Sequence, residues 1–120
     1  MKTVKEDGMR CPIASAVDLF NGRWKTSILW HLVDAPKRFN EIRRLLPQIS
    51  SRMLTKALRE LERDGLLMRQ VTFTSPVKVY YSKTELTETL IDIFKNLDTW
   101  QEVNMKSVYA ARQQYDALNA

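Results

Sequence analysis

The 120-residue sequence predicts a mainly α-helical fold that carries one small β-hairpin. Apolar residues recur at helical spacing over most of the chain, whereas the stretch from Leu67 to Ser82 alternates as strands do, and a helical pattern resumes at Thr84. Hydrophobic residues make up 44% and charged residues 28%, as in an ordinary globular protein. We therefore expect one domain over residues 11–120, preceded by a flexible polar tail at residues 1–10.

Two helices are expected in the first third of the chain. The first runs from Pro12 to about Phe20, because proline is favoured at the first helical position, and Asn21-Gly22 ends it. The second covers about Trp24 to Val33, and it stops before Pro36 because the residue preceding a proline disfavours helical backbone. Its apolar residues at helical spacing are Trp24, Ile28, Leu29, Leu32 and Val33.

A helix-turn-helix is expected next, at about residues 39–64. A short helix at about 39–46 is expected to turn four apolar residues inward: Phe39, Ile42, Leu45 and Leu46. Pro47-Gln48-Ile49 forms the turn. The following helix, at about 51–64, has Ser50 as a suitable N-cap and Gly65 as a suitable residue to end it. Its expected core stripe is Leu54, Ala57, Leu58 and Leu61.

A hairpin at about residues 67–82, with its tip near Ser75–Val77, corresponds to a wing. Thr84 can then cap a long helical region at about 84–118. A domain of this size cannot cover the whole apolar face of this region. Because an uncovered apolar face of this length usually marks a partner surface, we expect N- and C-terminal dimerisation helices. The residues that mark this face are Leu86, Leu90, Ile93, Leu97 and Trp100.

Positive charge is concentrated in the centre of the chain. Residues 37–78 contain ten Lys or Arg and four Asp or Glu, whereas residues 1–36 have a net charge of +1 and residues 79–120 of −2. Such a block is expected of a phosphate-binding surface, although a solvated basic face is the alternative. Two helices joined by a tight turn and followed by a hairpin form a winged helix-turn-helix, so DNA is the favoured partner.

The helix at 51–64 has the two faces that major-groove recognition requires. One face is apolar and holds the helix on the domain, while the other carries long donors. Arg52 and Arg59 suit guanine, and Lys56 suits phosphate. Lys78 can reach phosphate or the minor groove from the wing. The candidate DNA-binding residues are Lys37, Arg38, Ser50, Ser51, Arg52, Thr55, Lys56, Arg59 and Lys78.

Several segments of the chain resemble the HxlR-type family of bacterial transcription regulators, which is related to the MarR type. They are Cys11-Pro12, Asp18–Lys25, Ile28–Leu32, Pro36–Arg44, Ile49–Thr55 and Leu58–Leu66. The resemblance implies a homodimer that commonly represses transcription and often senses redox or electrophile stress through a cysteine near the N-terminus. The sequence departs from the family pattern at Val77, Tyr80 and Thr87, where proline, an acidic residue and glycine are usual.

Cys11 occupies the position of that sensing cysteine. It also directly precedes the first expected helix, where the helix dipole and Arg10 favour a thiolate. A thiolate reacts with quinones, aldehydes, hypochlorite or peroxide-derived species. As the lone cysteine it can form a disulfide only with another chain or a small thiol, and it suits a reducing cytoplasm. The alternative is a small packing residue at a dimer contact.

We therefore expect a cytoplasmic, dimeric regulator that needs no cofactor and binds a pseudo-palindromic operator, with its recognition helices about 34–36 Å apart. No signal peptide, membrane span, metal-ligand cluster or phosphate loop is seen, and Cys11 with His31 lacks an orienting third group, so neither a membrane protein nor an enzyme is expected. One alternative is a winged-helix module that binds protein rather than DNA. The other is a regulator that responds to an aromatic ligand bound by Trp24, Trp30, Phe39, Tyr81, Phe94 and Trp100.

Overall fold

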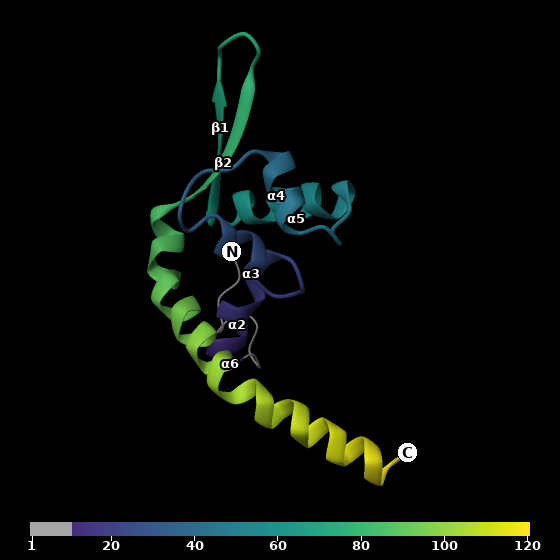
Figure 1. The fold of residues 1–120 in the computed structure, drawn as a ribbon. Coiled ribbons are helices and arrows are strands. Elements are labelled where there is room, and N and C mark those ends of the chain that lie inside the picture. The colour runs from purple at the N-terminus through teal and green to yellow at the C-terminus, as the bar shows by residue number, and fades with distance from the viewer. Residues whose placement is uncertain (1–10) are drawn as a thin grey trace. The chain divides into compact units, whose positions relative to one another are not determined.

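The computed structural model describes residues 11–120, so the expected tail and Arg10 lie outside the described residues. This part of the chain is mainly helical with one two-stranded hairpin, which confirms the predicted fold class (Figure 1). The elements in order are α2 (Pro12–Asp18), α3 (Lys25–His31), α4 (Phe39–Leu45), α5 (Ser51–Arg63), β1 (Leu67–Thr72), β2 (Lys78–Lys83) and α6 (Glu85–Leu118).

The chain divides into two compact units. The first unit ends at Glu88 and the second comprises Thr89–Ala120. The helix α6 crosses the boundary, so its first turn belongs to the first unit.

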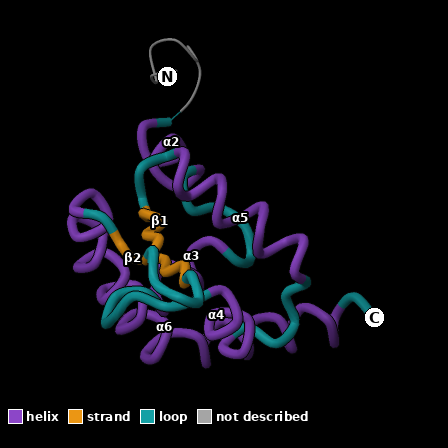
Figure 2. The backbone as a smooth tube through the Cα atoms, turned by 90° about the horizontal axis from the view of Figure 1, so that it is seen from above, coloured by secondary structure: helices purple, strands orange, loops and turns teal. Residues whose placement is uncertain are grey.

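The core of the first unit is built from three helices and the base of the hairpin. α3 packs against α4 and α5, while β1 packs against α5 and β2 against α4 (Figure 2). Nearly all of the buried residues are Leu or Ile, whose side chains pack densely in a small core. The buried residues of this unit include Ile28, Leu29, Leu32, Ile42, Leu46, Ile49, Leu54, Leu58, Leu61, Leu66 and Leu67.

The first two helices are shorter than the sequence predicts, by one or two residues at an end. α2 ends at Asp18, and the chain reverses through Gly22, whose φ of 93° is one that glycine adopts without strain. α3 begins after Trp24 and ends at His31. Helix ends fray, so differences of this size are expected.

The turn between α4 and α5 corrects one predicted core residue. Leu45 is 43% exposed, whereas Leu46 is buried. Leu46 lies four residues after the buried Ile42 and continues its face, while Leu45 is turned from Leu46 by about 100°. The N–H of Ile49 then donates to the carbonyl of Leu46 at 3.0 Å, which closes the turn.

Both predicted ends of α5 are confirmed. The hydroxyl of Ser50 accepts a hydrogen bond from the N–H of Met53 at 3.1 Å. At the other end Gly65 has a φ of 78°, and the N–H groups of Gly65 and Leu66 donate to the carbonyls of Glu62 and Leu61. This is a Schellman motif, which ends a helix and redirects the chain, here into β1.

The hairpin is antiparallel, with a register that runs from Leu67↔Lys83 to Thr72↔Lys78. β1 therefore ends at Thr72 and β2 begins at Lys78, so the tip lies where it is expected. Lys37 adds one bridge to the edge of the hairpin, because its N–H and carbonyl exchange hydrogen bonds with Tyr81 at 2.9 and 2.8 Å. The hairpin projects from α4 and α5 in Figure 1.

Two threonines tie the start of α6 to the end of α5. The hydroxyl of Thr84 donates to the carbonyl of Gly65 at 2.6 Å and accepts from the N–H of Thr87 at 3.4 Å. The hydroxyl of Thr87, which is fully buried, donates to the carbonyl of Leu66. The helix α6 therefore begins with the cap that the sequence predicts and with a second, buried hydrogen bond.

The second unit consists of the rest of α6, which is one uninterrupted helix over the long helical region that the sequence predicts. Its predicted apolar face is largely exposed, since Ile93, Leu97 and Trp100 are each half exposed or more, as is Leu86 in the first turn. Its buried residues are Ile91 and Phe94. Among residues 11–120, no helix is both long and apolar enough to cross a membrane.

The buried hydrogen bond of Thr87 generates a test of stability. Thr87→Val keeps the shape of the side chain but leaves the carbonyl of Leu66 without its hydroxyl donor, so we expect the free energy of unfolding to fall by about 1–3 kcal/mol. Urea unfolding followed by circular dichroism measures this loss. Thr87→Ser is the control, because it keeps the hydroxyl and removes one methyl group. A Thr87→Val protein as stable as the wild type would contradict the role of this hydroxyl.

Candidate nucleic-acid interface

The outer face of α5 carries a row of donors. Because the stripe of Leu54, Ala57, Leu58 and Leu61 is buried, the residues between its members turn away from the core. Six of these residues line one shallow open groove, called here the α5 groove: Ser51, Arg52, Thr55, Lys56, Arg59 and Glu60. The structure thus brings together five of the nine predicted DNA-binding residues.

The single carboxylate of the α5 groove is neutralised from outside it. Glu60 forms an ion pair with Lys25 of α3 at 2.7 Å and lies 3.9 Å from Lys56. The hydrogen bond from Lys25 holds the pKa of Glu60 below its ordinary value of 4.5, against the opposing effect of burial. Glu60 therefore stays charged but compensated, and Arg52, Lys56 and Arg59 give the groove a positive character.

A second depression connects α5 with the hairpin. This depression, the hairpin recess, is lined by Thr55, Leu58, Arg59, Glu62, Arg69 and Tyr81. Arg69 is a candidate site residue that the sequence reasoning missed. The signal was present, since Arg69 lies two residues from both Leu67 and Val71 and so shares their face of the strand, the face that meets α5.

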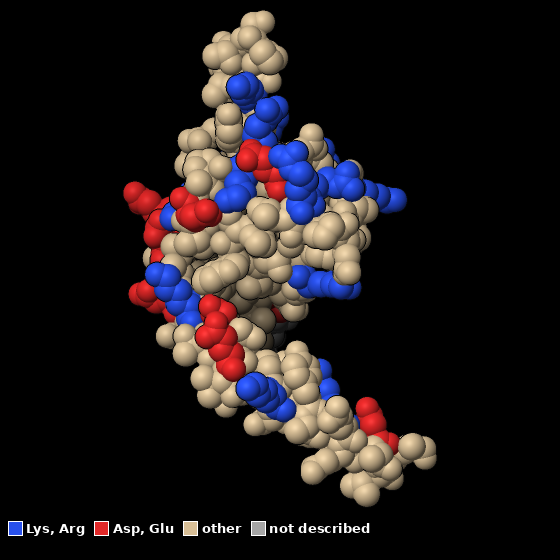
Figure 3. All heavy atoms as spheres, viewed as in Figure 1, with Lys and Arg blue, Asp and Glu red and all other residues tan. Residues whose placement is uncertain are grey.

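Positive charge extends from this recess over the neighbouring elements. Figure 3 shows Lys and Arg gathered at the base of the hairpin and over α4 and α5. Arg43 and Arg44, on the last turn of α4, are exposed and were also missed by the sequence reasoning. They lie in the basic central block of the sequence, which was the available signal.

Three of the predicted site residues have local partners as well as access to solvent. Arg38 is exposed, and its N–H donates to Glu41 at 2.9 Å at the start of α4. Ser50 uses its hydroxyl to cap α5. Lys78 is half-buried in the last pair of the hairpin, where its carbonyl accepts from the hydroxyl of Thr72 at 3.2 Å.

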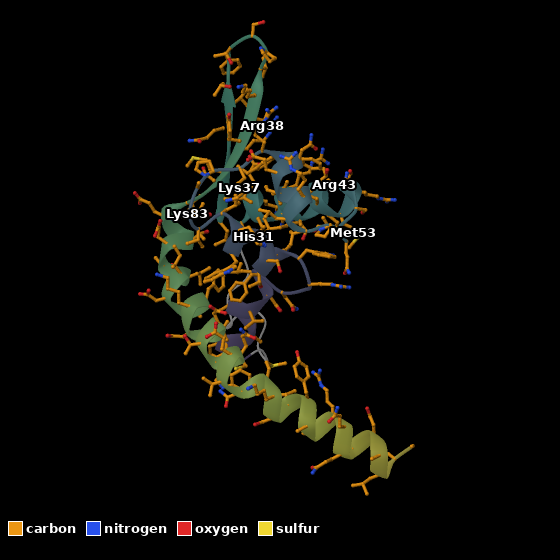
Figure 4. The ribbon with its side chains drawn as sticks, in the orientation of Figure 1. His31, Lys37, Arg38, Arg43, Met53 and Lys83 are labelled. Carbon is orange, nitrogen blue, oxygen red and sulfur yellow. The ribbon has the colours of Figure 1, made fainter. Side chains whose placement is uncertain are left out.

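Lys37 lies apart from the outward-facing cations. Its ammonium group donates to the carbonyl of His31 at 2.6 Å and pairs with Asp34 at 3.0 Å, and its side chain is only 16% exposed. The hydrogen bond from Lys37 lowers the pKa of Asp34. Figure 4 shows Lys37, His31 and Lys83 close together at the foot of the hairpin. The predicted contact of Lys37 with a DNA backbone is therefore not favoured by this geometry.

Lys83 makes a similar contact at the same place. Its ammonium group donates to the carbonyl of Val33 and pairs with Glu88 at 2.8 Å. Two lysines thus cover carbonyl groups at the end of α3, where the helix dipole favours positive charge. These contacts hold the base of the hairpin on the end of α3.

Cys11 is exposed and directly precedes α2. It contributes its carbonyl to the first turn, where it accepts from the N–H of Ser15 at 3.3 Å. α2 also exposes Ile13 and Val17, which are one helical turn apart.

The aromatic set that the sequence offers for a ligand is divided between the two units. Trp24, Trp30, Phe39 and Tyr81 belong to the first unit, whereas Phe94 and Trp100 belong to the second. The guanidinium group of Arg23 lies 5.0 Å from the ring of Trp24, a cation–π contact. An aromatic-ligand pocket stays a prediction.

Among the residues that the structure describes, no group of three or more His, Cys, Asp or Glu could hold a metal ion.

Comparison with known proteins agrees with this architecture. A family model described as HxlR-like helix-turn-helix matches residues 19–109. The uncharacterized HTH-type transcriptional regulator YdeP of Bacillus subtilis (strain 168) is 42% identical over 116 residues, which cover 94% of this chain and 91% of that protein. These relatives are regulators of transcription and not enzymes, as the sequence predicts.

Two solved structures are similar over most of their length. The redox regulator HypR in its reduced form has a TM-score of 0.80 and 42% identity, and the match covers 83% of this chain and 99% of that chain. The reduced form of the transcriptional regulator YodB from B. subtilis has a TM-score of 0.71 and 41% identity, and the match covers 78% of this chain and 93% of that chain.

Proposed function

The chain belongs to the HxlR-like helix-turn-helix family of transcriptional regulators, and from this premise we propose that it binds an operator with α5 in the major groove and the hairpin as a wing. The observation that carries the proposal is the α5 groove. It combines three long cations with two short hydroxyl side chains, and its one carboxylate is paired with Lys25. A helix with this outer face fits a groove about 12 Å wide.

The chemistry of each side chain in the α5 groove suits it to contact either bases or phosphates. Arg52 and Arg59 carry planar groups that can donate two hydrogen bonds to one guanine, and Ser51 and Thr55 allow close approach. Lys56 and Arg38 suit phosphates, as does Lys78 on the wing. Arg69 joins this set from the hairpin recess, where it lies beside Arg59.

We propose that the protein acts as a homodimer and that α6 supplies most of the contact. The exposed residues Ile93, Leu97 and Trp100 follow one another at helical spacing, and α2 exposes Ile13 and Val17. A second copy of the chain would remove this apolar surface from water. A two-fold dimer presents two copies of α5 to a pseudo-palindromic operator.

We propose further that Cys11 makes DNA binding sensitive to oxidants or electrophiles. Its thiol is exposed, and it directly precedes the apolar surface of α2 that the dimer would cover. The similar solved structures include HypR in reduced and oxidized forms and a diamide-treated YodB. Modification of Cys11 would change the spacing of the two copies of α5 in the dimer. The dimer, a cytoplasmic repressor in this proposal, would then dissociate from its promoter.

The dependence of DNA binding on salt tests the first proposal. We expect tight binding to a duplex at low salt, with log K falling linearly with log salt because several phosphates are neutralised. Lys56→Ala should reduce that slope by about 1, whereas Arg59→Ala should cost about 1–3 kcal/mol and relax the base preference at one position. Arg112→Ala, which removes a charge from the second unit, is the control. A wild-type chain that binds no duplex at low salt would refute DNA recognition and favour a protein-binding module.

The oligomeric state tests the second proposal. Leu97→Glu places a carboxylate in the apolar face of α6, so we expect dimer dissociation to become at least about a hundredfold easier, because an unpaired buried charge is costly. Sedimentation velocity measures this change. Lys95→Glu adds the same carboxylate about 200° around the helix and should leave the dimer intact. Equal behaviour of the two variants would exclude this face as the interface.

The response to diamide tests the role of Cys11. We expect wild-type protein to lose DNA affinity on treatment with diamide, which oxidises the thiol to a disulfide with another thiol, and to recover it with a reductant, because a thiolate is the reactive form of cysteine. A quinone, which alkylates the thiol, should cause a loss that a reductant does not reverse. Cys11→Ser should bind DNA as tightly as the wild type and no longer respond. Fluorescence anisotropy with a labelled duplex measures both states. A Cys11→Ser protein that still responds would eliminate this cysteine as the sensor.

A further inference from the structure

The tip of the hairpin carries two exposed apolar side chains. Phe73 is 90% exposed and Val77 is 58% exposed, and they stand at the two ends of the loop that joins β1 to β2. Within this loop the hydroxyl of Thr74 donates to the carbonyl of Pro76 at 3.0 Å. Single exposed apolar residues are common, but a phenylalanine paired with a valine at a projecting tip presents a small apolar surface.

The register of the hairpin gives the direction of this surface. Arg69 pairs with Tyr81, and both line the hairpin recess together with Thr55 and Arg59 of α5. Successive side chains alternate between the two faces of a strand, so Val71 shares the face of Arg69. Continued by one step beyond the last pair, the alternation puts Phe73 and Val77 on that same face. The apolar tip thus extends the surface that begins at the outer side of α5.

The length of the hairpin matches the geometry of DNA. Four residues separate Arg69 from Phe73, which corresponds to about 13 Å along a strand. The major groove is about 12 Å wide, so a hairpin that starts beside a helix in that groove reaches past the bordering phosphates. The next feature of the duplex is the minor groove, which is about 6 Å wide.

The charge of the hairpin favours DNA over an apolar protein surface as the occupant. Residues 65–84 contain three cations, Arg69, Lys78 and Lys83, and no Asp or Glu. Lys83 is engaged at the base of the hairpin, whereas Lys78 stands next to the tip. A cation beside an exposed phenylalanine suits a phosphate-lined groove whose walls are sugars.

We propose that Phe73, supported by Val77, is an apolar wedge that enters the minor groove beside the half-site read by α5 and bends the duplex there. The proposal rests on the proposed DNA binding and adds a residue that reads the deformability of DNA. Apolar wedges work best at steps that unstack easily, so the operator should carry a flexible pyrimidine–purine step where the tip lands.

Phe73→Ala separates this role from that of the cations. The wild-type protein first selects duplexes from a random-sequence pool, and its affinity for them is measured by anisotropy at several salt concentrations. We expect Phe73→Ala to lower affinity by about tenfold at every salt concentration, because without the wedge no apolar side chain fills the space between the unstacked bases of the bent duplex. The salt slope should not change, since no charge is removed. Energy transfer between dyes at the duplex ends should report a smaller bend.

Two controls accompany this variant. Phe73→Leu keeps an apolar wedge and should retain most of the affinity and bend. Met68→Ala removes an exposed side chain from the opposite face of β1 and should behave as the wild type. Because Phe73 is almost fully exposed, Phe73→Ala should also leave the free energy of unfolding unchanged.

The possible failures are distinct. If wild-type protein selects and binds duplexes but Phe73→Ala binds and bends them equally well, the wedge is overturned and the regulator stands. If Phe73→Ala changes the oligomeric state at unchanged DNA affinity, the tip contacts protein, and the wedge is again overturned. If wild-type protein binds no duplex, both the wedge and the proposed DNA binding fail.

Discussion

The burial of one stripe of α5 is the constraint on which the rest of the structure depends. Leu54, Ala57, Leu58 and Leu61 supply much of the core, and their burial sets the rotation of the helix about its axis. Once that rotation is set, the side chains of Arg52, Lys56 and Arg59 point away from the core. The same packing that stabilises the first unit therefore orients the surface that we propose for DNA binding, so a substitution that disturbs the packing also disturbs this surface.

The cations of the first unit serve two different purposes. Those on the outer faces of α4, α5 and β1 face solvent, where an anionic partner can meet them. Lys25, Lys37 and Lys83 instead hold parts of the first unit together: Lys25 neutralises Glu60, and the other two cover carbonyl groups at the end of α3. A count of positive charge along the sequence cannot separate the two groups. Their separation depends on which carboxylates and carbonyls the fold brings within reach.

The predicted site residues lie together where they share a single element. The five predicted DNA-binding residues from Ser51 to Arg59 line the α5 groove, because helical spacing alone sorts the two faces of the helix. Prediction was weaker for residues whose partners depend on how the chain folds around them. Lys37 is used internally by His31 and Asp34, and Arg69 joins the site only because β1 pairs with β2 and packs beside α5.

Local signals in the sequence determined where the elements begin and end. Ser50 begins α5 and Gly65 ends it, through hydrogen bonds and a backbone conformation that involve only neighbouring residues. Both ends can therefore be predicted without knowledge of the fold. Only the tertiary structure decided between Leu45 and Leu46 for the core and gave Thr87 its buried partner at Leu66. Each of these outcomes depends on groups far apart in sequence, whose meeting is a property of packing and not of any single segment.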